Sequence, residues 1–193
     1  MSLLLLLRGG VPAARTIPSI CLAAGILNIG SATNEGVLIE SVALPWFETL
    51  AILQRDPEAA YAIPPRSWEE IIAGAYSAAG FEEVVLTRRS GDLGRDVIAT
   101  RTGVGSICIY DKMKAYKPGH LVTADEVRAL VGVLQGNVSK GVVTTTSDFA
   151  PRLRSDPIMA PLMPHRLELK PGSILFPWLQ GIAEKPRDRP VRR

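Results

Sequence analysis

Apolar residues recur with a helical period at the start of the larger, C-terminal part of the chain. Trp68, Ile72 and Ala75 lie one and two turns apart, which predicts a helix with one buried face. Ser67 and Glu70 have the spacing of a capping box, so we expect the helix to begin at Ser67. An amphipathic helix is therefore expected to open this region.

The pattern then changes to short runs typical of strands, rich in β-branched and other apolar residues. Turns that contain glycine separate these runs, so three consecutive strands can form an antiparallel meander. The expected strands span residues 83–87, 95–100 and 106–114.

Helices and strands alternate in the remainder of the chain, and Thr123 is expected to cap the first of these helices. A strand–helix–strand order favours a parallel crossover, so we predict an α/β fold with a mixed β-sheet flanked by helices. The expected elements are a helix to about residue 137, a buried strand at 140–146, a helix beginning at Ser147, a strand at 166–170 and a closing helix at 171–182.

The stiff segment Ile63-Pro64-Pro65 suggests a boundary within the chain, because proline restricts both itself and the residue before it. Before it, a strand at 37–44 and a helix from Pro45 are expected. We therefore divide the chain into residues 1–62, an accessory or leader segment, residues 63–183, the main domain, and residues 184–193, a basic tail. The tail is expected to be disordered, with a phosphate-binding arm as the alternative.

Two apolar stretches precede the first expected strand, at residues 3–7 and 17–29. Both are shorter than the roughly 20 residues that cross a bilayer. Three interpretations stay open: a membrane-associating leader, an accessory packing segment, or an extension that does not fold. The last two together are favoured, so a membrane partner is not expected.

Composition is that of a globular protein: 193 residues, 47% hydrophobic and 21% charged. The formal net charge of +3 neither requires nor excludes a nucleic-acid partner. Cys21 and Cys108 lie far apart, outside any cysteine cluster, which argues against a disulfide framework and favours the cytoplasm. Cys108 lies in an apolar run and is expected to be a buried strand residue.

Candidate chemistry gathers on the meander and the helix before it. The glycine-rich turn at 91–94 leads to Asp96 at the start of a strand. On the next strand Lys112 and Lys114 share one face and Asp111 points to the other, because side chains alternate. With Glu69 on the helix, this provides the carboxylates and lysine that metal-assisted phosphodiester hydrolysis uses.

These pieces, in this order, resemble the Mrr-type catalytic domain of the PD-(D/E)xK restriction-endonuclease superfamily. The resemblance implies a restriction-endonuclease-like fold, DNA as the partner, Mg²⁺ as the cofactor, and a role in restricting foreign or modified DNA. It is carried by the segments at 67–70, 79–81, 90–99, 112–116, 122–130 and 140–149.

Carried over by position, Glu69 matches the helix carboxylate of this family, Asp96 its metal-binding aspartate and Lys114 its catalytic lysine. Lys112 departs from the pattern, since the family has Gln or Glu there. A lysine offers no acceptor to a metal. An ammonium at about 4 Å repels a cation by roughly 4 kcal/mol per unit charge at an effective dielectric of 20. Asp111 is the nearby carboxylate that a strand bulge could turn towards the metal.

Four further residues are candidates for contacting DNA. Arg88 and Arg89 precede the glycine-rich turn and can meet phosphates, or they form ordinary surface ion pairs. Tyr116 and Lys117 follow the lysine strand and can stack on or pair with DNA, or they are plain loop residues.

The leading hypothesis is a metal-dependent DNA endonuclease. A second is a DNA-binding module that has kept the fold and lost the chemistry through Lys112. A third, less favoured, is a membrane-associated or partner-bound structural protein that depends on the N-terminal apolar stretch. Cutting both strands with one site per chain requires a homodimer or two successive nicks, and both stay open.

Overall fold

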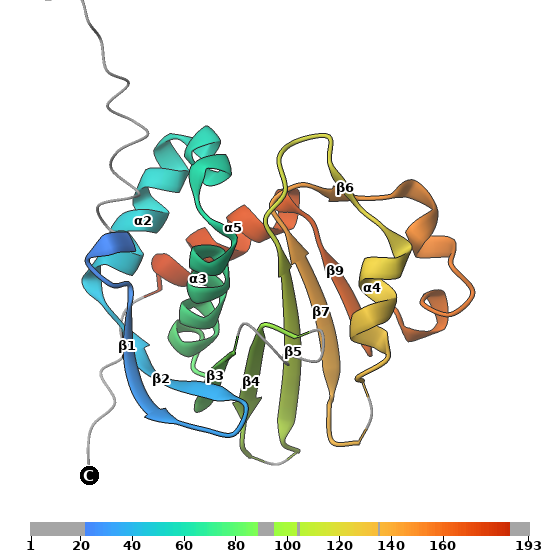
Figure 1. Ribbon diagram of the computed structural model, residues 1–193, viewed down its shortest axis with the longest axis horizontal. Helices are drawn as coiled ribbons and strands as arrows, with labels where there is room; N and C mark the ends of the chain where they lie inside the picture. The colour runs from blue at the N-terminus through green and yellow to red at the C-terminus, as the bar shows by residue number, and fades with distance from the viewer. Residues whose placement is uncertain (1–21, 89–94, 104, 135, 186–193) are drawn as a thin grey trace, which may run out of the picture.

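The computed structural model describes residues 22–88, 95–103, 105–134 and 136–185. Within them, seven strands form one mixed sheet in the order β1-β2-β3-β4-β5-β7-β9 (Figure 1). The strands are β1 (Leu27–Ala32), β2 (Gly36–Val42), β3 (Glu83–Thr87), β4 (Val97–Arg101), β5 (Ile107–Lys114), β7 (Lys140–Thr145) and β9 (Leu167–Lys170).

Strands β1 to β5 pair antiparallel in chain order, whereas β5–β7 and β7–β9 are parallel. The parallel pairs need crossovers, which helix α4 (Ala124–Val131) and the segment between β7 and β9 provide. The expected α/β fold, a mixed sheet flanked by helices, is thus confirmed.

Helices cover the two faces of the sheet and create two hydrophobic cores. Helix α3 (Pro65–Ala78) packs with α2 (Leu44–Arg55) and α5 (Gly172–Ala183) on one face, where Trp68 and Ile72 are fully buried. Helix α4 packs on the other face through Val127 and Leu130. Along β5, Met113 belongs to the first core and Tyr110 packs against the second, as strand alternation requires.

Several details differ from what the sequence predicts. Helix α3 begins at Pro65, before Ser67, so the predicted capping box is wrong, and proline supplies the helical backbone angle at the first position. Helix α4 ends at Val131 rather than near 137, although Thr123 is its N-cap residue as expected. Cys108 lies in a strand but is only half-buried.

The helix expected from Ser147 is also wrong. The chain forms the short strand β8 (Asp148–Phe149), paired with β6 (Leu121–Val122), and then two 3-10 turns, η3 (Pro151–Ser155) and η4 (Ala160–Leu162). Pro151 and Pro161 lack amide donors, so a continuous α-helix through this segment would lose hydrogen bonds.

Residues 22–62 share the sheet and core of the main domain. β2 pairs with β3, and the buried Trp46 donates its indole N–H to the carbonyl of Ile71 at 3.0 Å. A 3-10 turn, η2 (Pro57–Ala62), leads into α3. The division at residue 63 stays a prediction, and so does the tail, whose residues 186–193 lie outside the described part, as does the leucine run at 3–7.

Among the described residues, no helix combines the length and apolar character that crossing a membrane requires.

Candidate active site

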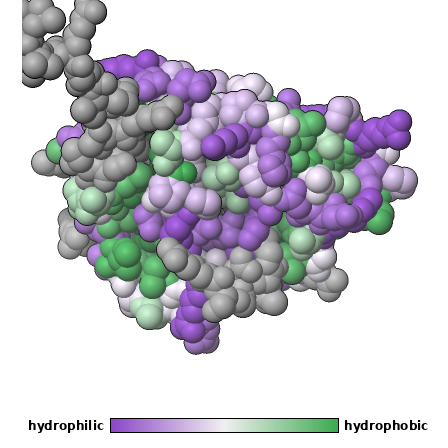
Figure 2. All heavy atoms as spheres, turned by 45° about the horizontal axis from the view of Figure 1, so that its top comes forward, coloured by the Kyte–Doolittle hydropathy of each residue, from purple (hydrophilic) through white to green (hydrophobic). Residues whose placement is uncertain are grey.

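A polar cavity of about 480 Å³ opens beside the N-terminal half of α3, where β3 and β4 approach β5. It brings together three of the predicted site residues, Glu69, Asp96 and Lys112, with the predicted DNA contact Arg88. Pro64, Pro65 and Arg66 complete its wall. Figure 2 shows a face of the molecule whose centre is largely hydrophilic, with apolar patches towards its sides.

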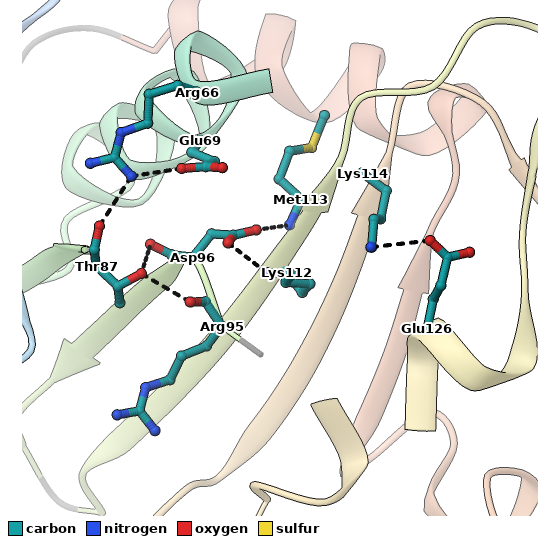
Figure 3. A network of polar contacts seen from close by, with 9 residues as sticks. All are labelled: Arg66, Glu69, Thr87, Arg95, Asp96, Lys112, Met113, Lys114 and Glu126. Atoms are coloured by element: carbon teal, nitrogen blue, oxygen red, sulfur yellow. Dashed lines mark hydrogen bonds and ion pairs between the residues drawn. The ribbon is translucent and has the colours of Figure 1, made fainter. Parts of the chain in front are cut away.

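Asp96 is fixed by the pairing of β4 with β5. Val97 lies opposite Asp111, so the preceding residue, Asp96, comes to Lys112. Lys112 Nζ donates to Asp96 Oδ1 at 2.8 Å, and the amide of Met113 donates to Asp96 Oδ2 at 2.8 Å (Figure 3). The Asp96 carboxylate, only 5% exposed, is therefore held by a backbone donor and an ammonium at once.

Glu69 enters the cavity from α3 and is held by an arginine one turn earlier. Arg66 Nη1 lies 2.7 Å from Glu69 Oε2 and also donates to the carbonyl of Thr87 at 3.0 Å. Burial raises the pKa of Glu69, and the negative charge of Asp96 raises it further. Arg66 and Lys112 act in the opposite direction without cancelling the rise. Two carboxylates thus share this cavity closely enough to disfavour each other's charge.

Lys114 shares the strand face of Lys112 but turns towards α4. Its Nζ lies 3.1 Å from Glu126 Oε1 (Figure 3). The hydroxyl of Tyr116 donates to the same carboxylate. Burial alone would raise the pKa of Glu126, but hydrogen bonds from Thr123, Tyr116 and Lys114 outweigh it and lower that pKa to about 2. Lys114 is therefore not among the residues that line the Glu69–Asp96 cavity.

Asp111 lies on the opposite face of β5 and is fully buried. Its Oδ2 accepts from the hydroxyls of Tyr76 at 2.7 Å and Thr144 at 3.0 Å. Burial raises its pKa to about 6, although nearby Lys170 lowers it. The β4–β5 register is continuous from Val97 to Arg101, so the bulge that would turn Asp111 towards the metal is not formed there. The geometry gives no support to Asp111 as a metal ligand.

The four predicted DNA contacts fall in different surroundings. Arg88 is exposed on the cavity wall and donates to the carbonyl of Thr33 at 3.2 Å. Tyr116 is half-buried and stacks on His120 with ring centroids 4.1 Å apart, and Lys117 is exposed in the loop after β5. Arg89 and the glycine-rich turn lie outside the described residues. The DNA-contact roles stay predictions.

Sequence reasoning missed Arg66 and Glu126. Arg66 precedes Glu69 by one turn of α3, and the pair was missed because the helix was expected to begin at Ser67, after Arg66. Glu126 lies on α4, three residues after the N-cap residue Thr123, and from there it contacts Lys114 on β5. No local pattern in the sequence indicates that pairing.

The carboxylates of Glu69 and Asp96 fit a divalent cation in number and kind, since Mg²⁺ is commonly held by one or two carboxylates, waters and a phosphate oxygen. No group of three or more His, Cys, Asp or Glu placed to hold a metal occurs among the described residues. Lys112 occupies Asp96 Oδ1, so an ion binding there must displace its ammonium. The two carboxylates are suitable ligands for Mg²⁺, whereas the positive charge of Lys112 beside them opposes its binding.

Residues 60–155 match the family model for the Mrr catalytic domain, described as restriction endonuclease. Among solved structures, MspJI restriction endonuclease in complex with a 27-mer oligonucleotide is similar, with a TM-score of 0.48 and 18% identity, over 70% of this chain and 31% of that one. The DNA modification-dependent restriction endonuclease AspBHI has a TM-score of 0.46 and 21% identity, over 72% of this chain and 40% of its own. The chain therefore spans well under half of either protein. No curated protein matches it. Over residues 60–155, the chain belongs to the Mrr catalytic-domain family of restriction endonucleases.

Proposed function

We propose that this chain is a DNA endonuclease of the Mrr kind, which hydrolyses phosphodiester bonds with Mg²⁺ held by Asp96 and Glu69. The observation that carries the proposal is the meeting of these two carboxylates in one cavity of a restriction endonuclease domain. The negative charge of Asp96 raises the pKa of Glu69, because the two carboxylates repel each other. A cation between the two carboxylates would relieve this repulsion.

The residues around the cavity have complementary roles in this proposal. Arg66, Arg88 and Lys112 place positive charge beside a DNA phosphate, which favours its binding and the charge that develops on it during hydrolysis. When bound, the metal ion would polarise the phosphate and lower the pKa of a bound water. Lys114 would assist only after leaving Glu126, because its ammonium pairs with that carboxylate.

A DNA-binding module without cleavage is the second candidate, and the contact of Lys112 Nζ with Asp96 at 2.8 Å favours it. A lysine bound directly to the metal-binding carboxylate can supply the positive charge that a phosphate needs without any metal. Such a module would bind DNA in a salt-dependent manner and in the presence of EDTA.

The test is incubation of the purified chain with supercoiled plasmid in Mg²⁺, Mn²⁺ or EDTA, alongside Asp96→Ala. Asp125→Ala is the matched control, because Asp125 is an exposed aspartate on α4, with its side chain 89% exposed. DNA binding by each variant is measured in parallel in EDTA, so that loss of cleavage is separated from loss of affinity.

The endonuclease predicts metal-dependent nicking that Asp96→Ala abolishes and Asp125→Ala retains. Nicked circles before linear DNA would indicate successive nicks, and direct linear product would indicate a dimer. Binding in EDTA without nicking in either metal would overturn the endonuclease and support the module. Nicking that survives Asp96→Ala would place the chemistry elsewhere.

A further inference from the structure

A second cavity, of about 530 Å³, opens at the other end of α3, where β5, β7 and β9 meet α5. It shares no lining residue with the Glu69–Asp96 cavity. Its volume lies in the range of small-molecule sites. Its wall combines aromatic and charged side chains: Tyr76, Phe81, Trp178, Lys140, Glu168 and Lys170.

Lys170 is the unusual member of this wall. The residue is only 6% exposed, and its Nζ lies 3.6 Å from the ring centroid of Trp178 and 5.8 Å from that of Tyr76. Burial lowers the pKa of Lys170. An ammonium has three donors, yet within the described residues no hydrogen bond joins Lys170 Nζ to an oxygen. A buried cation on an aromatic face therefore has donors to offer a ligand in the cavity.

The neighbouring carboxylates, Glu168 and Asp111, make no hydrogen bond to Lys170 among the described residues. Glu168 pairs with Lys140, with Nζ and Oε2 3.0 Å apart. Asp111 lies behind the wall without surface exposure, and its Oδ2 is occupied by Tyr76 and Thr144. The charge of Asp111 stabilises that of Lys170 without covering its donors. The donors of Lys170 are thus left for an acceptor that enters the cavity.

Three rings give the cavity flat apolar surfaces at an angle to one another. Tyr76 meets Phe81 edge to face at 5.2 Å, and Trp178 is tilted against Tyr76 at 5.5 Å. Such surfaces suit a planar ring, because aromatic pairs prefer edge and offset contacts. A ligand for this cavity therefore has two parts, an anionic acceptor for Lys170 and an aromatic ring for the wall.

We propose that this cavity binds a small aromatic carboxylate, whose oxygens accept from Lys170 Nζ while its ring packs on Trp178 and Phe81. The site is separate from the proposed nuclease site. It can bind its ligand whether or not the chain cleaves DNA, so the two proposals fail independently.

Tryptophan fluorescence of the full chain provides the readout. Trp46 and Trp68 are fully buried in the core, whereas Trp178 lines the cavity and is partly exposed. Phenylacetate is the probe and phenylacetamide its uncharged match. Lys170→Met removes the charge and Lys170→Arg keeps it. Lys185→Met, in the exposed segment after α5, is the control.

We expect phenylacetate to quench the fluorescence and to bind roughly tenfold more tightly than phenylacetamide, a ratio worth about 1.4 kcal/mol. Lys170→Met should abolish the preference, Lys170→Arg should restore part of it, and Lys185→Met should leave it unchanged. Where Lys170→Met fails to fold by circular dichroism, Ile174→Ala replaces it. Ile174 lines the cavity but is 48% exposed, so its truncation should weaken both probes with the fold intact. Equal binding of the two probes, or no binding of either by the wild-type chain, would overturn the proposal.

Discussion

Asp111 and Lys112 are consecutive residues of β5, yet they belong to two very different sites. Lys112 opens onto a polar cavity and pairs with Asp96, with its side chain 20% exposed. Asp111 is fully buried on the α3 face, held by Tyr76 and Thr144, with Lys170 as the cation that lowers its pKa. Because side chains alternate along a strand, Lys112 faces the cavity and Asp111 faces the buried core.

The two carboxylates, Asp96 beside Lys112 and Asp111 beside Lys170, differ in the groups that can compensate their charge. The backbone amide of Met113 still donates to Asp96, on the wall of the cavity, when Lys112 moves away. The Oδ1 atom of Asp111 has no hydrogen-bond partner among the described residues, and burial raises its pKa to about 6. Asp96 can therefore exchange the ammonium of Lys112 for another cation. The raised pKa of Asp111 makes the stability of the fold depend on pH.

Removing Lys170 or Lys112 should change the free energy of unfolding by different amounts, and this is the largest difference we expect between the two sites. Lys170→Met leaves a fully buried carboxylate uncompensated, and we expect it to lower the free energy of unfolding by about 3 kcal/mol at pH 8. Lys112→Met should cost less, about 1.5 kcal/mol, because Asp96 keeps the backbone donor of Met113 and lines a cavity. Urea unfolding measures both, and Asp111→Asn combined with Lys170→Met should recover most of the loss. Equal costs for the two single variants would remove the distinction.

The titration of Asp111 should be visible in the pH dependence of stability. Its pKa is about 6 in the folded chain against 3.8 for an ordinary aspartate, so between these values the folded state holds a proton that the unfolded state has lost. Stability from this group is therefore greatest below pH 4 and falls as the pH rises to 6, by up to about 3 kcal/mol. Asp111→Asn should flatten this fall in urea titrations at successive pH values. A parallel profile for both proteins would contradict the buried charge.

Glu126 should show the opposite and smaller pH effect. Its pKa is lowered to about 2, so its contribution to stability is present above pH 4.5 and is lost as the pH falls towards 2. Because solvent screens this partly exposed group, we expect about 1 kcal/mol. Glu126→Gln should remove the loss below pH 4.5 in thermal unfolding. Asp125→Asn, whose carboxylate is exposed on the same helix, is the control.

Local patterns in the sequence predicted much of this site. Strand alternation places Lys112 and Lys114 on one face and Asp111 on the other, and the family resemblance selects Glu69 and Asp96. Pairings between distant elements were not predictable, because they depend on register and packing: Lys114 with Glu126, and Asp111 with Tyr76.

The predicted helix bounds are wrong where prolines determine the backbone structure. The two prolines before Arg66 begin α3 earlier than the capping-box pattern suggests, since Pro65 can occupy the first turn of a helix. Pro151 and Pro161 divide the segment after β8 into 3-10 turns. The apolar pattern there is compatible with a helix, and the missing amide donors override it.

A calorimetric titration of Mg²⁺ and Mn²⁺ tests whether Lys112 competes with a metal ion for Asp96. It compares the wild-type chain with Lys112→Gln, and Asp96→Ala serves as the control that removes the ligand. Gln removes the ammonium and adds an acceptor, so we predict at least about tenfold tighter metal binding by Lys112→Gln, and none by Asp96→Ala. Equal affinities in the wild-type chain and Lys112→Gln would show that Lys112 does not compete with the metal ion for Asp96.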